Sequence, residues 1–205
     1  MPDIAAFSLA AATGYLFGAV PFGLVLTQMA GVGDIRQIGS GNIGATNVLR
    51  TGRRDLAAAT LFLDMFKAGI IAFVFWRIFG KDVGMVAGAA ALVGHCYPIW
   101  LNFKGGKGVA TYAGLVVVTT LPGFLIGAPL WIGVFALSRI SSLAALITAF
   151  TIPIALAVTG ELGWLPESPF VIGVFALLTA LLFWRHRENI ARLIRGEEPR
   201  FGASK

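Results

Sequence analysis

Residues 108–137 read GVATYAGLVVVTTLPGFLIGAPLWIGVFAL and contain no charged side chain. A helix that crosses the hydrocarbon core of a membrane needs about 20 mostly apolar residues, so this stretch is too long for one ordinary span. Pro122 and Gly123 lie near its middle, where they favour a break. We therefore predict two consecutive short helices here, and a short helix often does not cross the full hydrocarbon thickness.

The composition of the whole chain is typical of a membrane protein. Hydrophobic residues make up 57% of its 205 residues and charged residues 13%, whereas soluble domains contain about 25% charged residues. The net charge of +6 does not indicate nucleic-acid binding, because long apolar runs separate the basic residues. One cysteine and two histidines argue against a disulfide framework and against a metal site. We expect an all-α integral membrane protein.

Five further apolar stretches can each form a spanning helix: 4–30, 56–79, 83–101, 143–160 and 170–184. Lys and Arg gather on the cytoplasmic side of membrane proteins, which decides between six and seven spans. With seven spans and the N-terminus outside, 13 of the 16 Lys and Arg residues lie in cytoplasmic segments. Six spans would place Arg139 and the basic C-terminal tail on the opposite side. We therefore predict one polytopic domain over 1–205, with seven transmembrane helices and a cytoplasmic C-terminus.

The first predicted cytoplasmic loop is richer in polar groups than a short connection requires. It reads Gly-Ser-Gly-Asn-Ile-Gly-Ala-Thr-Asn over 39–47, and Arg50 follows. Glycines let backbone N–H groups approach an anion, and a guanidinium is a planar donor suited to phosphate. The candidate ligand-binding residues are Gly39, Ser40, Gly41, Asn42, Thr46, Asn47 and Arg50. The alternative is a flexible turn that caps the next helix.

The second loop ends with Lys104, Gly105, Gly106, Lys107 and Gly108, and then opens the next helix. A helix N-terminus presents unpaired N–H groups and the positive end of the helix dipole. We therefore expect the glycine N–H groups to face an anion, with both lysines beside it. The spacing is not that of a Walker A loop. Alternatively, these basic residues only anchor the cytoplasmic side of the protein.

The third polar segment, 186–195, follows the last predicted span. It contains His186, Glu188, Asn189 and Arg192. At helical spacing Glu188 and Arg192 are four residues apart, which predicts an ion pair between them. The alternative is a basic amphipathic helix that only lies on the membrane surface.

All three segments fall on the cytoplasmic side in the seven-span arrangement. The turn at 139–142, which contains Ser142, falls there too. Four segments from different parts of the chain can therefore converge on one anion pocket, rich in glycine N–H groups, cations and hydroxyls.

Two titratable groups within one predicted span have a structural explanation. Asp64 and Lys67 lie one helical turn apart, and we expect them to neutralise each other, although ionisable residues in spans are candidates for function. His95 lies near a helix end, and we expect a hydrogen-bonded structural histidine rather than a metal ligand.

These motifs resemble one family closely, the bacterial membrane acyltransferases that use acyl phosphate and glycerol 3-phosphate (PlsY type). The resemblance rests on 39–50, 94–111 and 186–193, and the turn at 139–142 is similar to a fourth motif. It implies a seven-helix enzyme of the bacterial inner membrane with its active site at the cytoplasmic face. The implied reaction transfers a fatty acyl group from acyl phosphate to the 1-hydroxyl of glycerol 3-phosphate. The products are 1-acylglycerol 3-phosphate (lysophosphatidate) and phosphate, in the first step of bacterial phospholipid synthesis.

The resemblance also implies which residues and partners take part. The acyl-phosphate group would be held by Ser40, Gly41, Thr46 and Asn47, and the phosphate of glycerol 3-phosphate by Arg50, Lys107, Ser142 and, in support, Lys104. The other substrate-binding candidates are Gly39, Asn42, Gly105, Gly106, Gly108 and Glu188. The partners would be acyl phosphate, glycerol 3-phosphate and membrane lipid, with no cofactor and no nucleic acid, and we expect a monomer.

Four residues are expected to be catalytic: Ser40, Lys107, His186 and Asn189. His186 and Asn189 would orient the attacking glycerol or assist proton removal, with the departing phosphate as a competing proton acceptor. Glu188 would pair with a nearby cation. An acyl phosphate is a mixed anhydride and already activated, so the enzyme needs no nucleophile of its own.

A transporter or channel for an organic phosphate is the alternative from another class. A basic cytoplasmic vestibule would also suit permeation. Transporters of this kind often contain inverted repeats and bind substrate near the membrane midplane. This sequence has no visible repeat, and its polar groups lie at one face. These two features favour the enzyme.

Overall fold

The computed structural model describes residues 3–163 and 167–202, which contain helices and no β-strand. The chain divides into two compact units, Met1–Thr119 and Thr120–Lys205. The helices of the first unit are α1 (Ile4–Gly18), α2 (Phe22–Met29), α3 (Ala45–Leu49), α4 (Arg54–Phe79), α5 (Lys81–Cys96) and α6 (Val109–Thr119), with short 3-10 helices at Ile35–Gln37 and Ile99–Leu101. The second unit contains α7 (Leu121–Ser138), α8 (Ser141–Glu161), α9 (Pro169–Arg185) and α10 (Arg187–Ile194).

Local sequence sets where these helices begin and end. The Asp3 side chain caps α1 by accepting a hydrogen bond from the Ala6 N–H at 2.9 Å. The first predicted span is broken at Pro21, after which α2 begins. The predicted break near Pro122 lies at Thr120 instead, whose hydroxyl caps α7. Proline is tolerated in the first turn of a helix, because the N–H that it lacks has no partner there.

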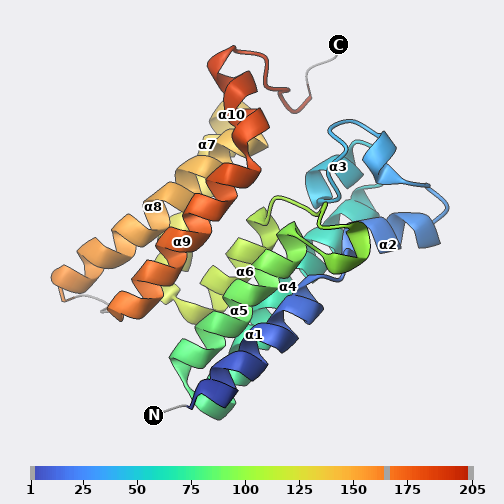
Figure 1. Ribbon diagram of the computed structural model, residues 1–205. Coiled ribbons are helices and arrows are strands. Elements are labelled where there is room, and N and C mark those ends of the chain that lie inside the picture. Colours follow the sequence, from blue (N-terminus) through green and yellow to red (C-terminus); the bar gives the residue numbers. More distant parts are fainter. Residues whose placement is uncertain (1–2, 164–166, 203–205) are drawn as a thin grey trace. The chain divides into compact units, whose positions relative to one another are not determined.

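Small residues let the long helices of the first unit approach closely. Figure 1 shows α1, α4, α5 and α6 running side by side. A Cβ on Gly14 of α1 would collide with the Ala87 carbonyl of α5, and one on Gly114 of α6 with the Met65 carbonyl of α4. Close backbone approach through small residues is typical of helix packing in membranes.

Five helical segments of the described chain are long and apolar enough to cross a membrane: 4–29, Arg54–Phe79, Lys81–Leu101, Leu121–Ser138 and Ser141–Glu161. Helices α9 and α10 pass the same test as a pair bent by 64° and would make a sixth. Of the two helices expected within 108–137, α6 is short, with 11 residues, and spans about 16 Å. The expectation that α7 is also short was wrong, because it has 18 residues.

Both polar loops of the first unit lie at one end of it. The segments 30–53 and 97–108 are grouped at the end away from the N-terminus of α1 (Figure 1). An apolar cluster that includes Ile35, Ile43 and Val48 supports the first loop, and Leu101, just before the second loop, packs against this cluster. The same apolar cluster thus packs beneath both predicted anion-binding segments.

Candidate functional site

Asn47 determines the shape of the first loop. Its side chain is 1% exposed, and its Nδ2 donates to the carbonyls of Ile35 at 2.8 Å and Ile38 at 3.0 Å. Its Oδ1 accepts from the Ser40 N–H at 3.1 Å. These bonds use both amide hydrogens and the oxygen, so Asn47 holds the conformation of the loop.

Arg50 lies against the glycine turn that precedes Ser40. A Cβ on Gly39 would be 2.9 Å from Arg50 Nη1 and 2.6 Å from Asn47 Oδ1, and the backbone there has φ of +57°. Only glycine fits this position without displacing both side chains. Ser40 and Arg50 are exposed, whereas Asn42 and Thr46 are partly buried. The Arg50 guanidinium therefore lies at the turn that precedes Ser40, and the Ser40 hydroxyl is 3.4 Å from Asn47 Oδ1.

The second loop folds back onto the end of α5. The N–H of Gly105 donates to the Cys96 carbonyl at 3.1 Å, and that of Gly106 to the His95 carbonyl at 3.0 Å. The expectation that these two N–H groups face an anion was therefore wrong. They satisfy carbonyls at the C-terminal end of a helix, which have no partner within it. The cations of the loop are Lys104, which is exposed, and Lys107, which is partly buried.

The predicted ion pair between Asp64 and Lys67 is confirmed, and it is part of a larger buried cluster. Lys67 is fully buried, with Nζ 2.7 Å from Asp64 Oδ1, 3.0 Å from the Val20 carbonyl and 2.9 Å from His95 Nδ1. An ammonium group only donates, so Nδ1 accepts and the neutral ring carries its proton on Nε2. A Cβ on Gly106 would collide with this Nε2. The cluster thus links the break before α2 to the second polar loop.

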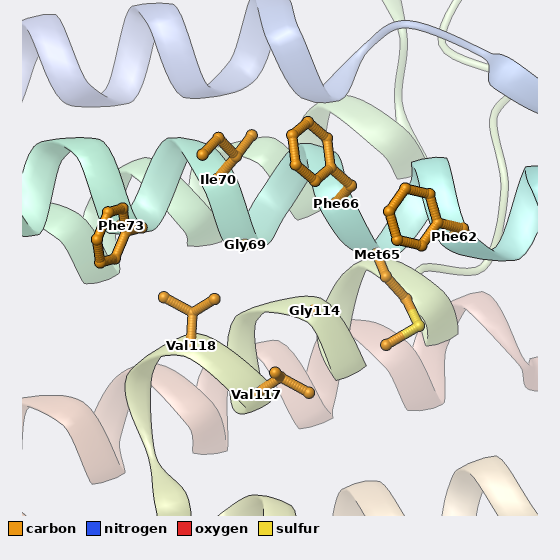
Figure 2. Close-up of a pocket in the computed structure, with 9 residues that line it drawn as sticks. All are labelled: Phe62, Met65, Phe66, Gly69, Ile70, Phe73, Gly114, Val117 and Val118. Atoms are coloured by element: carbon orange, nitrogen blue, oxygen red, sulfur yellow. The ribbon is translucent and has the colours of Figure 1, made fainter.

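An apolar groove lies in the first unit, between the two helices that follow the polar loops. It has a volume of about 370 Å³ and lies between α4 and α6 (Figure 2). The residues that line it are apolar or glycine: Phe62, Met65, Phe66, Gly69, Ile70, Phe73, Gly114, Val117 and Val118. Helices α4 and α6 directly follow the first and second polar loops. This groove can hold a hydrocarbon chain.

In the second unit the structure brings Ser142 and Asn189 together through Glu198. One carboxylate oxygen, Oε1, accepts from Ser142 Oγ at 2.6 Å and from Asn189 Nδ2 at 2.5 Å. The other, Oε2, accepts from Arg192 Nε at 2.7 Å. Glu198 was not among the predicted site residues, and its one signal in the sequence is a pair of acidic residues in an otherwise basic tail.

The predicted pair between Glu188 and Arg192 was wrong. Arg192 binds Glu198 instead, and Glu188 is exposed in the first turn of α10. Burial raises the pKa of Glu198, but the hydrogen bonds from Ser142, Asn189 and Arg192 outweigh it and hold that pKa below its ordinary value. The carboxylate is therefore ionised at neutral pH.

His186 lies at the bend between α9 and α10. It is 2% exposed, and its Nδ1 is 2.8 Å from the Leu182 carbonyl. A carbonyl only accepts, so Nδ1 carries a proton and donates it to this carbonyl. This hydrogen bond fixes the plane of the imidazole ring at the bend.

Comparison with known proteins identifies the family. The profile of the glycerol-3-phosphate acyltransferase family matches residues 8–196. The chain belongs to this family. A glycerol-3-phosphate acyltransferase of Hyphomonas neptunium is 56% identical over 206 residues, with 100% of this chain and 97% of the relative covered. Another, of Maricaulis maris, is 58% identical over 196 residues, with 96% and 88% covered.

Solved structures agree with this result. The crystal structure of PlsY (YgiH), an integral membrane glycerol 3-phosphate acyltransferase, in its glycerol 3-phosphate form is 37% identical, with a TM-score of 0.87 and 96% of each chain covered. The lysophosphatidic acid form gives 36% identity and a TM-score of 0.86, with 96% of this chain and 95% of that chain covered.

In this member of the glycerol-3-phosphate acyltransferase family, the predicted site residues form two groups. The first unit holds those of the first and second loops, at one end of its helices. The second unit holds Ser142, His186 and Asn189, with Ser142 and Asn189 joined by Glu198. The first group contains Arg50, whose guanidinium suits a phosphate, whereas Arg192 beside the second group is paired with Glu198.

Proposed function

We propose that this protein transfers a fatty acyl group from acyl phosphate to the 1-hydroxyl of glycerol 3-phosphate, forming lysophosphatidate and phosphate. The observation that carries the proposal is the 37% identity, over 96% of the chain, to an acyltransferase structure in its glycerol 3-phosphate form. The cationic loops of the first unit and the apolar groove below them support it, because the donor combines a phosphate with a long hydrocarbon chain.

The proposed setting is the bacterial inner membrane. We assign the seven proposed spans to the α1–α2 segment, α4, α5, α6, α7, α8 and α9, and we propose that the short α6 crosses only part of the membrane. The N-terminus lies outside and the active site faces the cytoplasm, where the loops concentrate Lys and Arg. The protein acts as a monomer without a cofactor.

In the proposed reaction the 1-hydroxyl oxygen attacks the carbonyl carbon of the acyl phosphate. An ester C–O bond forms, the C–O bond to phosphate breaks, and phosphate departs with the electron pair. The hydroxyl proton passes to His186 Nε2 or to the departing phosphate. Positioning of the hydroxyl about 3–3.5 Å from the carbon and stabilisation of the developing charge by fixed donors supply the catalysis.

The residue roles in this proposal follow the two loops. The Ser40 turn, shaped by Asn47, holds the acyl phosphate. Arg50 and Lys107, with Lys104 in support, hold the phosphate of glycerol 3-phosphate. Gly105, Gly106 and Gly108 contribute the conformation of the second loop, and Asn189 orients the glycerol.

Replacing Lys107 by alanine is expected to raise the KM for glycerol 3-phosphate by about 10- to 100-fold, with a smaller effect on the KM for acyl phosphate. A hydrogen bond to a charged group contributes about 1.5–3 kcal/mol. Steady-state kinetics with each substrate varied in turn measures both constants. Lys81→Ala, at the opposite end of α5, is the control. Unchanged saturation by glycerol 3-phosphate in Lys107→Ala removes Lys107 from this role.

The groove between α4 and α6 is proposed to take the acyl chain. Val117→Trp should fill the end of the groove that lies far from the loops. Exclusion of two methylene groups, at about 0.8 kcal/mol each, should lower kcat/KM for palmitoyl phosphate about tenfold, while octanoyl phosphate is much less affected. Val158→Trp on α8 is the control, because Val158 is similarly exposed, at 49% against 45% for Val117. Equal losses with both chain lengths would mean that the groove holds a structural lipid instead.

The donor is tested directly with purified protein. Palmitoyl phosphate and palmitoyl-CoA are supplied separately with glycerol 3-phosphate, and the lipid product is identified by mass spectrometry. We expect lysophosphatidate when the donor is palmitoyl phosphate and none when it is palmitoyl-CoA. Product from palmitoyl-CoA, or none from palmitoyl phosphate with folded protein, would refute the proposed donor.

A further inference from the structure

The last described residues of the chain return to the beginning of α8. We name residues 196–202 the C-terminal strap. The N–H of Phe201 donates to the Arg139 carbonyl at 2.7 Å, and its ring lies edge-on to Phe135 with the centroids 5.8 Å apart. Between these contacts and α10, the Glu198 side chain is 7% exposed. The strap thus inserts one ionised group beside two predicted site residues.

The hydrogen bond from Ser142 to Glu198 restricts what Ser142 can offer a ligand. A serine hydroxyl has one hydrogen to donate and two lone pairs. At 2.6 Å from Oε1, that hydrogen is directed at the carboxylate, in the short range of charge-assisted bonds. A ligand at Ser142 therefore meets an acceptor oxygen. A phosphate oxygen also only accepts, and it would be repelled by the neighbouring carboxylate.

We propose that Glu198 is a positioning residue that sets Ser142 to bind the 2-hydroxyl of glycerol 3-phosphate rather than its phosphate. This inference rests on the proposed function and replaces the expected phosphate role of Ser142. The substrate has two hydroxyl groups, and the 1-hydroxyl must release its proton during attack. The 2-hydroxyl keeps its hydrogen and can donate it to Ser142 Oγ throughout the reaction.

Glu198 orients rather than relays a proton. Its second oxygen is bound by Arg192 at 2.7 Å, which stabilises the ionised form. Asn189 donates to the same oxygen as Ser142, so one carboxylate fixes two site residues from α8 and α10. The C-terminal strap therefore orients the side chains that distinguish glycerol 3-phosphate from an alkyl phosphate without the 2-hydroxyl.

An acceptor that lacks the 2-hydroxyl, 3-hydroxypropyl phosphate, tests this assignment. Ser142→Ala and Glu198→Ala should each raise the KM for glycerol 3-phosphate about tenfold, and Ser142→Ala should change the KM for 3-hydroxypropyl phosphate less than about threefold. The double variant should be no worse than Glu198→Ala, because Glu198→Ala already removes the acceptor that orients Ser142. Glu197→Gln is the matched control, since Glu197 is exposed and pairs with Arg195.

A second variant separates two roles of Glu198: orienting Ser142, and anchoring the strap through the ion pair with Arg192. Glu198→Gln keeps an oxygen for Ser142 and Asn189 but loses the charge that binds Arg192. It should retain the preference for glycerol 3-phosphate that Glu198→Ala loses. The inference would be overturned if Glu198→Gln and Glu198→Ala lost the preference for glycerol 3-phosphate equally. It would also be overturned if Ser142→Ala raised the KM for both acceptors by the same factor.

The outcome for wild-type protein keeps this inference distinct from the proposed function. Wild-type protein that acylates neither acceptor overturns both. Active wild-type protein whose Ser142→Ala variant does not distinguish the acceptors overturns the role of Glu198 alone. Ser142→Ala provides this answer even if Glu198→Ala fails to fold.

Discussion

Replacing Lys67 by methionine is expected to lower the free energy of unfolding by about 3–5 kcal/mol, because it leaves the Asp64 carboxylate buried without its partner. Lys67 is fully buried and Asp64 is 2% exposed. The same substitution removes the donor to the Val20 carbonyl and to His95. Equilibrium unfolding in detergent should show a clear loss, with less monodisperse protein after purification.

The double variant Lys67→Met with Asp64→Asn is the control for this effect. A neutral amide leaves no unpaired charge, so the double variant should recover a large part of the lost stability, as replacements of whole buried ion pairs often do. A single variant as stable as the wild-type protein would show that the buried cluster contributes nothing to the fold.

Replacing His186 by alanine is expected to lower kcat by about 10²–10⁴, the usual contribution of a positioned acid–base group. The Leu182 carbonyl holds the ring through Nδ1, and the proposed role of His186 is to receive the proton of the attacking hydroxyl on Nε2. Steady-state kinetics with glycerol 3-phosphate varied at saturating palmitoyl phosphate measures the loss.

The contrasting result would be a raised KM for glycerol 3-phosphate with kcat within about threefold of wild type. His186 would then only orient the substrate, and the departing phosphate would take the proton. A thermal unfolding curve that matches wild type is the required control, because the backbone of His186 also ends α9.

The sequence predicted those features that depend on local spacing. Asp64 and Lys67 are three residues apart on a helix, and this spacing correctly indicated their ion pair. The length of the apolar stretch 108–137 correctly indicated two helices, although the position of the break depended on the Thr120 cap. The polar loops were found because their composition differs from that of a short connection.

Features that depend on distant segments were missed or assigned wrongly. The glycine N–H groups of the second loop bind carbonyls of α5, which no local pattern indicates. Arg192 prefers Glu198 over the helical neighbour Glu188 because the strap brings a buried carboxylate that also binds Ser142, 56 residues away in the chain. Such contacts are decided by tertiary packing rather than by periodicity.

Acyl transfer is tested by the release of inorganic phosphate from palmitoyl phosphate by purified protein, without added metal. We expect release that requires glycerol 3-phosphate and equals the lysophosphatidate formed, one for one. Release that is independent of glycerol 3-phosphate, or no release by folded protein across several acyl lengths, would contradict the account.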